Sequence, residues 1–365
     1  MSLGRAAGIG PRRFVRLVEF FGSPQAVLGR TAAEVSRAAC VPLDVAAGVL
    51  RSVPGIEEDL QVQAMARAGA RLVTYLSTEY PPLLRNIHDF PPFLFVRGMT
   101  LSSLGAPARG QDRTPWVAVV GSRKATPYGR SMAAALARDL SLSGVVVVSG
   151  MAAGIDSCAH RGALDGGGPT VAVLGTGVDV PYPRANAALL ESIIHSGAVV
   201  SEYPMGSQPE PWRFPARNRI ISGMCEATVV VEAGESSGAL ITADFALEQG
   251  REVLAVPGPA GAAMSRGTNG LIRSGAGLVE TAADVLEPLG LETSGGGTGR
   301  GTGCGAQPSV EEGAVMEALR EGPMSVGEVA QSTGMDLPGV MGSLTKLEIM
   351  GLVCRLPGGV YCRRR

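Results

Sequence analysis

The turn from residue 121 to residue 124 has the residue types of a phosphate-binding loop: Gly121, Ser122, Arg123 and Lys124. It joins a strand-like apolar run, 116–120, to a helical pattern that starts with Thr126 and Pro127 as cap and first-turn residues. A helix N-terminus presents unpaired N–H groups, glycine lets a ligand approach the backbone, and arginine pairs with phosphate oxygens. The turn therefore predicts a phosphate-bearing ligand. The alternative is an ordinary tight turn with exposed basic residues.

A second stretch mixes aromatic and basic side chains where a loop passes into a helix: Trp212, Arg213, Phe214, Arg217, Asn218 and Arg219. Single-stranded nucleic acid is bound by such a mixture, because bases stack on aromatic rings while cations pair with phosphates. The stretch therefore favours nucleic-acid binding. The alternative is that Phe214 packs into the core while the arginines solvate the start of a helix.

Candidate catalytic groups are few. Asp156 and His160 have the spacing of a metal pair on one helix, but the chain has only three histidines and no third ligand is evident. A helix-cap role for Asp156 and a packed or exposed His160 is the preferred interpretation. Ser236 and Ser237 have no nearby histidine, so their hydroxyls are predicted to bind phosphate. Neither a metal site nor a catalytic residue is predicted.

These turns need a scaffold, and the pattern after residue 115 supplies one. Apolar runs of strand length alternate with glycine-rich turns and helical runs, at 116–120, 145–149, 171–174, 198–201, 228–232 and 252–256. Strands apolar on both faces predict a parallel sheet covered by helices on both sides, an α/β doubly wound Rossmann-like fold. Its ligand site lies beyond the carboxyl ends of the strands. No G-x-G-x-x-G follows the first strand and no P-loop is present, so no nucleotide cofactor is expected.

Four parts are predicted along the chain: a helical domain over 1–69, the Rossmann-like domain over 70–289, a Gly-rich linker over 290–308 and a winged helix over 309–365. The first part resembles a SAM or helix-hairpin-helix domain, with packing favoured over DNA contact. Residues 93–96 are expected to form an edge strand.

The winged helix is predicted from three short helices and a hairpin that turns at 357–359. Cys354 and Cys362 are expected to face each other across that hairpin. Its candidate recognition helix carries one cation, Lys346, beside Glu348, so partner docking or regulation is favoured over duplex reading.

Composition excludes several classes of protein. The 365 residues are 45% hydrophobic and carry a net charge of −1, so the chain is not coated in positive charge for duplex binding. No run approaches the ~20 apolar residues that a membrane span requires, and the N-terminus lacks the apolar core of a signal peptide. A cytoplasmic protein is expected. The six cysteines form no C-x-x-C pair, so no zinc knuckle is indicated.

Ordered motifs over about residues 80–279 are similar to the DNA-processing protein A (DprA/Smf) family, among them VAVVGSRKATPYG, SGMAAGIDSCAHRGAL, FPARNRIISG and VVEAGESSGALITADFALEQGREVLAVPG. The resemblance implies a non-catalytic homodimer that binds and protects incoming single-stranded DNA and loads the RecA recombinase onto it during natural transformation. It implies DNA contacts by Gly121, Ser122 and Arg123, by Phe214, Arg217, Asn218 and Arg219, and by Ser237, Gly238 and Thr242.

One enzymatic alternative stays open. Phosphoribohydrolases of the lysine-decarboxylase-like type use a related Rossmann scaffold and a P-G-G-x-G-T-x-x-E motif that supplies a catalytic glutamate. The corresponding turn here, 234–242, lacks a glutamate at that position. The two hypotheses differ in outcome, since only the enzyme would release a free base from a nucleoside monophosphate.

Overall fold

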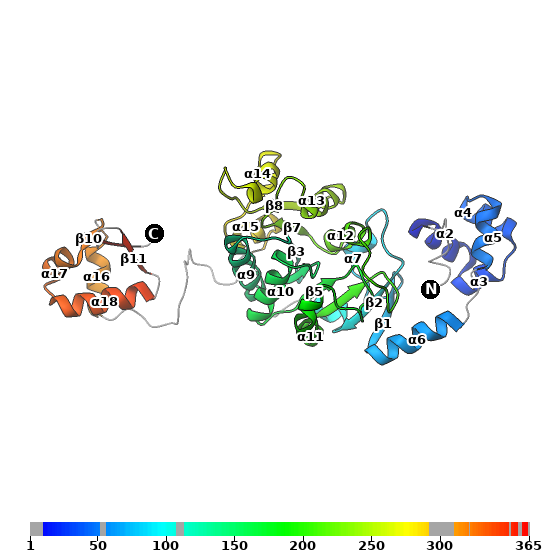
Figure 1. Ribbon diagram of the computed structural model, residues 1–365, viewed down its shortest axis with the longest axis horizontal. Helices are drawn as coiled ribbons and strands as arrows, with labels where there is room; N and C mark the ends of the chain where they lie inside the picture. The colour runs from blue at the N-terminus through cyan, green and yellow to red at the C-terminus, as the bar shows by residue number, and fades with distance from the viewer. Residues whose placement is uncertain are drawn as a thin grey trace. The chain divides into compact units, whose positions relative to one another are not determined.

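The computed structural model describes residues 10–51, 56–106, 113–291, 310–320, 322–349, 352–356 and 360–363. The chain divides into two compact units, Met1–Ser294 and Gly295–Arg365. The first contains a large β-sheet covered by helices, and the second contains a small helical domain with a short sheet (Figure 1). The predicted hairpin turn at 357–359, the start of the chain before residue 10, and the predicted linker beyond residue 291 lie outside the described residues.

A nine-stranded sheet organises the first unit. Its order is β1-β2-β6-β5-β4-β3-β7-β8-β9. The strands are β1 (Ala70–Thr74), β2 (Phe93–Gly98), β3 (Trp116–Val120), β4 (Val146–Ser149), β5 (Thr170–Val173), β6 (Ala198–Ser201), β7 (Ala227–Val230), β8 (Glu252–Ala255) and β9 (Gly277–Leu278). The strands β3 to β9 pair in parallel, while β1 and β2 are antiparallel to their neighbours. The predicted doubly wound α/β fold is confirmed.

The edge-strand prediction for residues 93–96 was wrong. The strand β2 lies between β1 and β6, so β1 forms the edge of the sheet. All four residues from Phe93 to Val96 are buried. The prolines that suggested an edge precede the strand at 91 and 92, where a missing N–H removes no bond from the ladder.

Helices cover both faces of the sheet because every central strand is apolar on both sides. In β3, Val117 and Val119 pack in one core cluster with residues of α9 (Pro127–Leu142) and α10 (Ile155–Asp165), while Ala118 and Val120 pack in another with residues of α12 (Arg213–Gly223) and α13 (Gly238–Glu248). The helices that follow residue 81 in this unit are α7 (Pro82–Arg85), α8 (Leu101–Leu104), α9 (Pro127–Leu142), α10 (Ile155–Asp165), α11 (Ala187–Ser196), α12 (Arg213–Gly223), α13 (Gly238–Glu248), α14 (Arg266–Arg273) and α15 (Ala282–Leu286).

The N-terminal helices are α2 (Pro11–Phe21), α3 (Pro24–Leu28), α4 (Ala32–Ala39), α5 (Leu43–Arg51) and α6 (Ile56–Ala68). Their buried side chains belong to the same core cluster as residues of the sheet, and the rings of Phe14 and Tyr75 have centroids 6.4 Å apart. A domain boundary between residues 69 and 70 therefore stays a prediction.

The second unit has three helices and a three-stranded sheet of order β10-β12-β11 in its described residues. Its elements are α16 (Val310–Ala318), β10 (Met324–Ser325), α17 (Val326–Thr333), α18 (Leu337–Ile349), β11 (Val353–Leu356) and β12 (Val360–Arg363). Ser325 and Glu328 form the predicted capping box at the start of α17. Cys354 pairs in register with Cys362, as expected.

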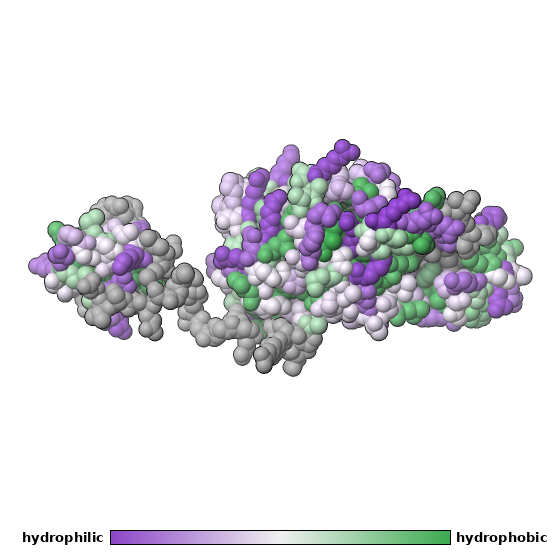
Figure 2. Space-filling model, turned by 90° about the horizontal axis from the view of Figure 1, so that it is seen from below, coloured by the Kyte–Doolittle hydropathy of each residue, from purple (hydrophilic) through white to green (hydrophobic). Residues whose placement is uncertain are grey.

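Among the described residues, no helix is both long enough and apolar enough to cross a membrane. Figure 2 shows hydrophilic and hydrophobic residues interspersed over the visible face of the molecule.

Candidate functional site

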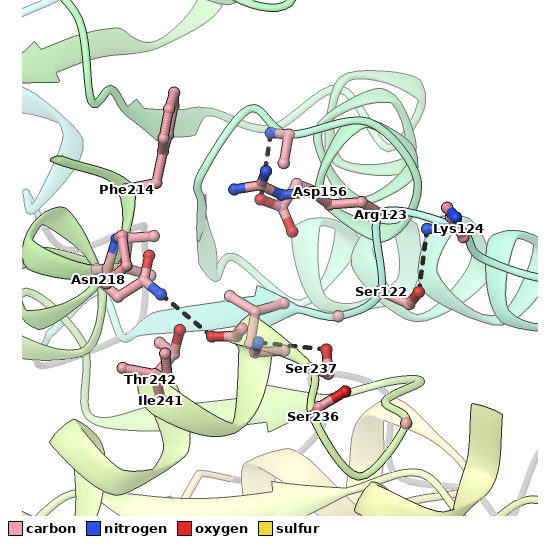
Figure 3. Close-up of a pocket in the computed structure, with 18 of the residues that line it drawn as sticks. Ser122, Arg123, Lys124, Asp156, Phe214, Asn218, Ser236, Ser237, Ile241 and Thr242 are labelled. Atoms are coloured by element: carbon pink, nitrogen blue, oxygen red, sulfur yellow. Dashed lines mark hydrogen bonds between the residues drawn. The ribbon is translucent and has the colours of Figure 1, made fainter. Parts of the chain in front are cut away.

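A cavity of about 440 Å³ opens at the carboxyl ends of β3 and β7. The chain leaves β3 toward β4 on one side and later crosses to β7 on the other, so this is the topological switch point of the sheet. Three turns meet there, and ten of the eleven predicted site residues line the cavity: Gly121, Ser122, Arg123, Lys124, Phe214, Arg217, Asn218, Ser237, Gly238 and Thr242. Figure 3 labels seven of them around the hollow: Ser122, Arg123, Lys124, Phe214, Asn218, Ser237 and Thr242.

Two hydrogen bonds of Ser122 hold the first turn in place. Ser122 N–H donates to the carbonyl of Glu232 over 2.7 Å, and the Ser122 hydroxyl accepts from the N–H of Lys124 over 3.0 Å. Arg123 and Lys124 are exposed. A Cβ at Gly121 would lie 2.5 Å from Cγ1 of Ile155, so this glycine is required by packing against α10. The turn therefore presents two cations from a fixed backbone.

Glu232 secures the helix behind this turn, a role that the sequence did not reveal. Its buried carboxylate accepts from the N–H and the hydroxyl of Thr126, each over 2.8 Å. Thr126 is the N-cap of α9 and Pro127 its first residue, as predicted. A carboxylate at a helix N-terminus is stabilised by the unpaired N–H groups there. Glu232, in the loop after β7, thus holds both ends of the turn: its carbonyl accepts from Ser122 and its carboxylate accepts from Thr126.

Aromatic and cationic groups meet on the opposite wall. The guanidinium carbon of Arg123 lies 5.3 Å from the centroid of the Phe214 ring, and the Tyr182 ring lies 5.2 Å from the same centroid. Phe214 is only half-buried and lines the cavity. It is therefore a wall residue, not a core residue.

Arg217 forms part of the floor of the cavity. It is buried, and its guanidinium donates to the carbonyl of Gly150 over 2.7 Å and to that of Val173. These carbonyls follow β4 and end β5, so the side chain ties two strand ends to α12. Burial lowers the pKa of Arg217 to about 10, and Asp156 opposes this shift in part. The group stays charged at neutral pH.

Asp156 differs from its predicted cap role. The N-cap of α10 is Gly154, and Asp156 accepts from the N–H of Ala152 in the preceding loop over 3.2 Å. Burial raises the pKa of Asp156, and Arg217 opposes that shift. The Asp156 side chain therefore faces Arg217 rather than capping α10, and it lines the cavity.

His160 is a packed residue. It is buried, with Nδ1 at 2.8 Å from the hydroxyl of Thr170. Burial, helped by Arg217, lowers its pKa to about 3. No cluster of three metal-ligating side chains occurs in the part of the chain that the structure describes.

The third turn closes the cavity. Ser237 is the N-cap of α13, with its hydroxyl 3.4 Å from the N–H of Ala239, and the Asn218 amide donates to the carbonyl of Gly238 over 3.3 Å. Ser236, whose hydroxyl the sequence also predicted to bind phosphate, lines the cavity as well. Ile241 and Met264 are among the lining residues that sequence reasoning left out, and nothing in the pattern around Met264 indicates a site.

Comparison with known proteins decides the family. Residues 71–290 match the family described as DNA recombination-mediator protein A, and residues 305–359 match the DprA winged helix domain. The chain belongs to this family. The second match confirms the predicted winged helix, of which part lies in the described residues.

Relatives of the family in several bacteria resemble most of the chain. A putative DNA processing protein DprA of Mycobacterium tuberculosis is 40% identical over 322 residues, covering 84% of this chain and 80% of the relative. The crystal structure of DprA from Streptococcus pneumoniae has a TM-score of 0.67 at 35% identity, covering 78% of this chain and 95% of that one. DprA from Helicobacter pylori, described for its single-stranded DNA binding mode, has a TM-score of 0.53 at 27% identity, covering 60% and 95%.

Arg219 is the one predicted residue that the structure does not bring to the cavity. The Arg219 residue is 8% exposed. Its guanidinium donates two hydrogen bonds to the Glu202 carboxylate, at 2.7 and 2.8 Å, and one to the Asp89 carboxylate at 2.9 Å. Burial acts to lower its pKa, but Glu202 and Asp89 outweigh it and hold the pKa above the usual range. In this protein, Arg219 therefore forms a structural ion pair with Glu202 and Asp89.

Proposed function

We propose that this protein binds single-stranded DNA in the cavity at the switch point and changes no covalent bond in it. The observation that carries the proposal is the meeting of Arg123 with Phe214, which offers a cation and a ring face together. A phosphate requires the first and a base requires the second. Membership of the DNA recombination-mediator family supports the same ligand.

The local charge of the cavity supports a polyanion. Its lining includes three cationic side chains, Arg123, Lys124 and Arg217, against one carboxylate, Asp156. The N-terminus of α13, whose Gly238 and Ala239 line the cavity, adds N–H groups and partial positive charge. A chain with a net charge of −1 thus has a positive groove where a DNA backbone would pass. Ser237 and backbone groups contact phosphate without reading sequence, so binding is proposed to be sequence-tolerant.

The finer activities come from the family resemblance. We propose that the protein protects incoming DNA, loads RecA onto it during natural transformation, and acts as a cytoplasmic homodimer. RecA loading is measured by the rate of RecA strand exchange on single strands coated with a single-strand-binding protein. Addition of this protein is expected to speed exchange, and no acceleration would remove RecA loading while leaving DNA binding in place.

The phosphoribohydrolase alternative receives no support from the cavity. Its one carboxylate, Asp156, is buried against Arg217, and the adjacent Glu235 does not line it. Release of free base from nucleoside monophosphates by the purified protein would favour the phosphoribohydrolase over the DNA-binding function.

The site itself is tested by substitution. Arg123→Ala is expected to weaken binding of a fluorescent oligonucleotide at least several-fold at low salt, because a charged hydrogen bond to phosphate contributes about 1.5–3 kcal/mol. The salt dependence of the dissociation constant should also become shallower, since fewer counterions are released. Arg161→Ala is the matched control, because Arg161 is an exposed arginine on α10 outside the cavity. Unchanged affinity of Arg123→Ala at low and moderate salt would reject the site.

A further inference from the structure

A second aromatic and cationic group lies outside the cavity, and we name it the Trp212 cluster: Tyr203, Trp212 and Arg213. The Arg213 guanidinium carbon lies 4.8 Å from the Tyr203 ring centroid and 5.3 Å from that of Trp212. The two rings have centroids 6.0 Å apart and are nearly perpendicular. The Trp212 residue is 59% exposed. A tryptophan this exposed in a rigid setting offers a large ring face to a ligand.

Polar contacts with Glu210 and Gln208 hold the side chains of the cluster in place. Glu210 accepts from the indole N–H of Trp212 over 2.6 Å and pairs with Arg213 over 2.6 Å. Arg213 also donates to the carbonyl of Gln208 over 2.8 Å. Little side-chain freedom remains to be lost on binding, so stacking on this ring face costs less entropy than on a mobile side chain.

The cluster borders a hollow of about 780 Å³ on the other face of α12. Trp212, Ala216 and Arg219 line this hollow, at the spacing of one helix face. Phe214 and Asn218, on the opposite side of α12, line the cavity instead. The first turn of α12 therefore separates the two hollows by its own width.

The second hollow has no excess of positive charge. Two carboxylates line it, Asp89 and Glu202, and two arginines, Arg213 and Arg219, offset them. The exocyclic amino groups of cytosine, adenine and guanine can donate to carboxylates of this kind. The surroundings of the cluster therefore fit the edge of a base better than a phosphate.

We propose that the Trp212 cluster is a second nucleobase subsite, in which a base of the bound single strand stacks on Trp212 and Arg213 and points its edge toward Asp89 and Glu202. The inference rests on the proposed function of the cavity. It extends the DNA track across α12 and predicts a modest preference for bases that carry an amino group over thymine, within binding that is otherwise sequence-tolerant.

Tryptophan fluorescence tests the subsite directly. The chain has two tryptophans, and Trp116 is buried in β3, so Trp212 is the exposed reporter. Stacking of a base should quench its emission. An oligocytidine of about 15 nucleotides should quench it, and one of about 5 nucleotides that fills only the cavity should quench it less, given site sizes of roughly 4–16 nucleotides. Subtracting the signal of Trp212→Phe isolates the reporter.

Affinity provides the second readout. Trp212→Ala is expected to weaken the long oligocytidine about fivefold or more, the lower end for loss of one stacked base, and to leave the short one unchanged. Trp212→Phe should restore most of the loss. Phe20→Ala is the control, since Phe20 is an exposed aromatic residue on α2 that lines neither hollow. Oligothymidine of the same length should bind more weakly than oligocytidine.

The outcomes separate the two proposals. Tight DNA binding with unquenched Trp212 emission, or full affinity in Trp212→Ala, would overturn the subsite, while the function of the cavity stands. Failure of the wild-type protein to bind either oligonucleotide would overturn the proposed function itself.

Discussion

The guanidinium of Arg123 lies over the ring of Phe214 at 5.3 Å, although one residue belongs to the loop after β3 and the other to the start of α12. The contact joins the two stretches that the sequence marked separately as phosphate-binding and base-stacking. An arginine already held over a ring loses less freedom when it binds phosphate. The two side chains should therefore act as one unit in DNA binding.

A double-mutant cycle measures that unit. Arg123→Ala and Phe214→Ala are each expected to weaken binding of a short oligonucleotide, and the double variant should lose less than the sum. The expected coupling is about 0.5–2 kcal/mol, the range of a cation–π contact as it is desolvated. Fluorescence anisotropy at fixed salt provides the four dissociation constants. Strictly additive losses would show that the two residues bind the strand independently.

Arg219 should behave as a structural residue. Arg219→Ala leaves the carboxylate of Glu202, whose side chain is 18% exposed, without its bidentate partner. Breaking a buried pair by removing one member costs about 3–5 kcal/mol, so the urea midpoint should fall strongly at neutral pH. Binding of a short oligonucleotide to the folded protein should be unchanged. Arg161→Ala, an exposed substitution, is expected to shift stability by no more than about 0.5 kcal/mol. A stable Arg219→Ala protein that fails to bind DNA would assign Arg219 to the ligand after all.

The sequence predicted the central strands to within two residues, because burial on both faces leaves uninterrupted apolar runs such as 116–120. It also predicted the location of the cavity, since turns that follow parallel strands share one edge of the sheet. It did not separate Arg217 from Arg219. Residues two apart on a helix point about 200° apart, so one lies under the cavity and the other meets Glu202, yet both look alike in the motif.

Long-range partners explain the remaining differences. Glu232 had no visible partner in sequence because Thr126, which it caps, is remote in the chain. The edge position of β2 was mispredicted because its pairing with β1 and β6 is decided by tertiary packing. Local propensity carries no information on such contacts.

His160 should make the fold sensitive to acid. The Thr170 hydroxyl donates to the carbonyl of Val147, so it accepts from Nδ1–H of His160, and Nε2 is buried without a hydrogen-bond partner among the described residues. Protonation at Nε2 would bury an unpaired charge. The pKa is about 3 in the native state against about 6.5 when unfolded. Between pH 6.5 and pH 3, His160 binds a proton in the unfolded chain but not in the folded one. Stability is therefore unaffected by His160 above pH 6.5 and decreases as the pH falls below that value.

The acid effect is measured against a variant without the imidazole. From pH 7 to pH 5 the wild type should lose about 2 kcal/mol more unfolding free energy than His160→Gln, following ~1.4 kcal/mol per pH unit below 6.5. Urea titrations at both pH values provide the comparison, and common losses from carboxylates cancel in the difference. Equal losses in the two proteins would mean that His160 is protonated in the native state.

Gly121 and Gly238 both line the cavity, but a methyl group has different consequences at each. A Cβ at Gly121 would lie 2.5 Å from Cγ1 of Ile155 and 2.9 Å from the Glu232 carbonyl oxygen, so Gly121→Ala should destabilise the fold by about 1–3 kcal/mol. A Cβ at Gly238 meets nothing within 4 Å, and alanine favours the first turn of α13. Gly238→Ala should therefore keep or slightly raise the thermal midpoint while it lowers DNA affinity several-fold. Since the protein leaves that space open, any loss of affinity there reports the bound strand, and wild-type affinity would show that DNA does not approach the N-terminus of α13.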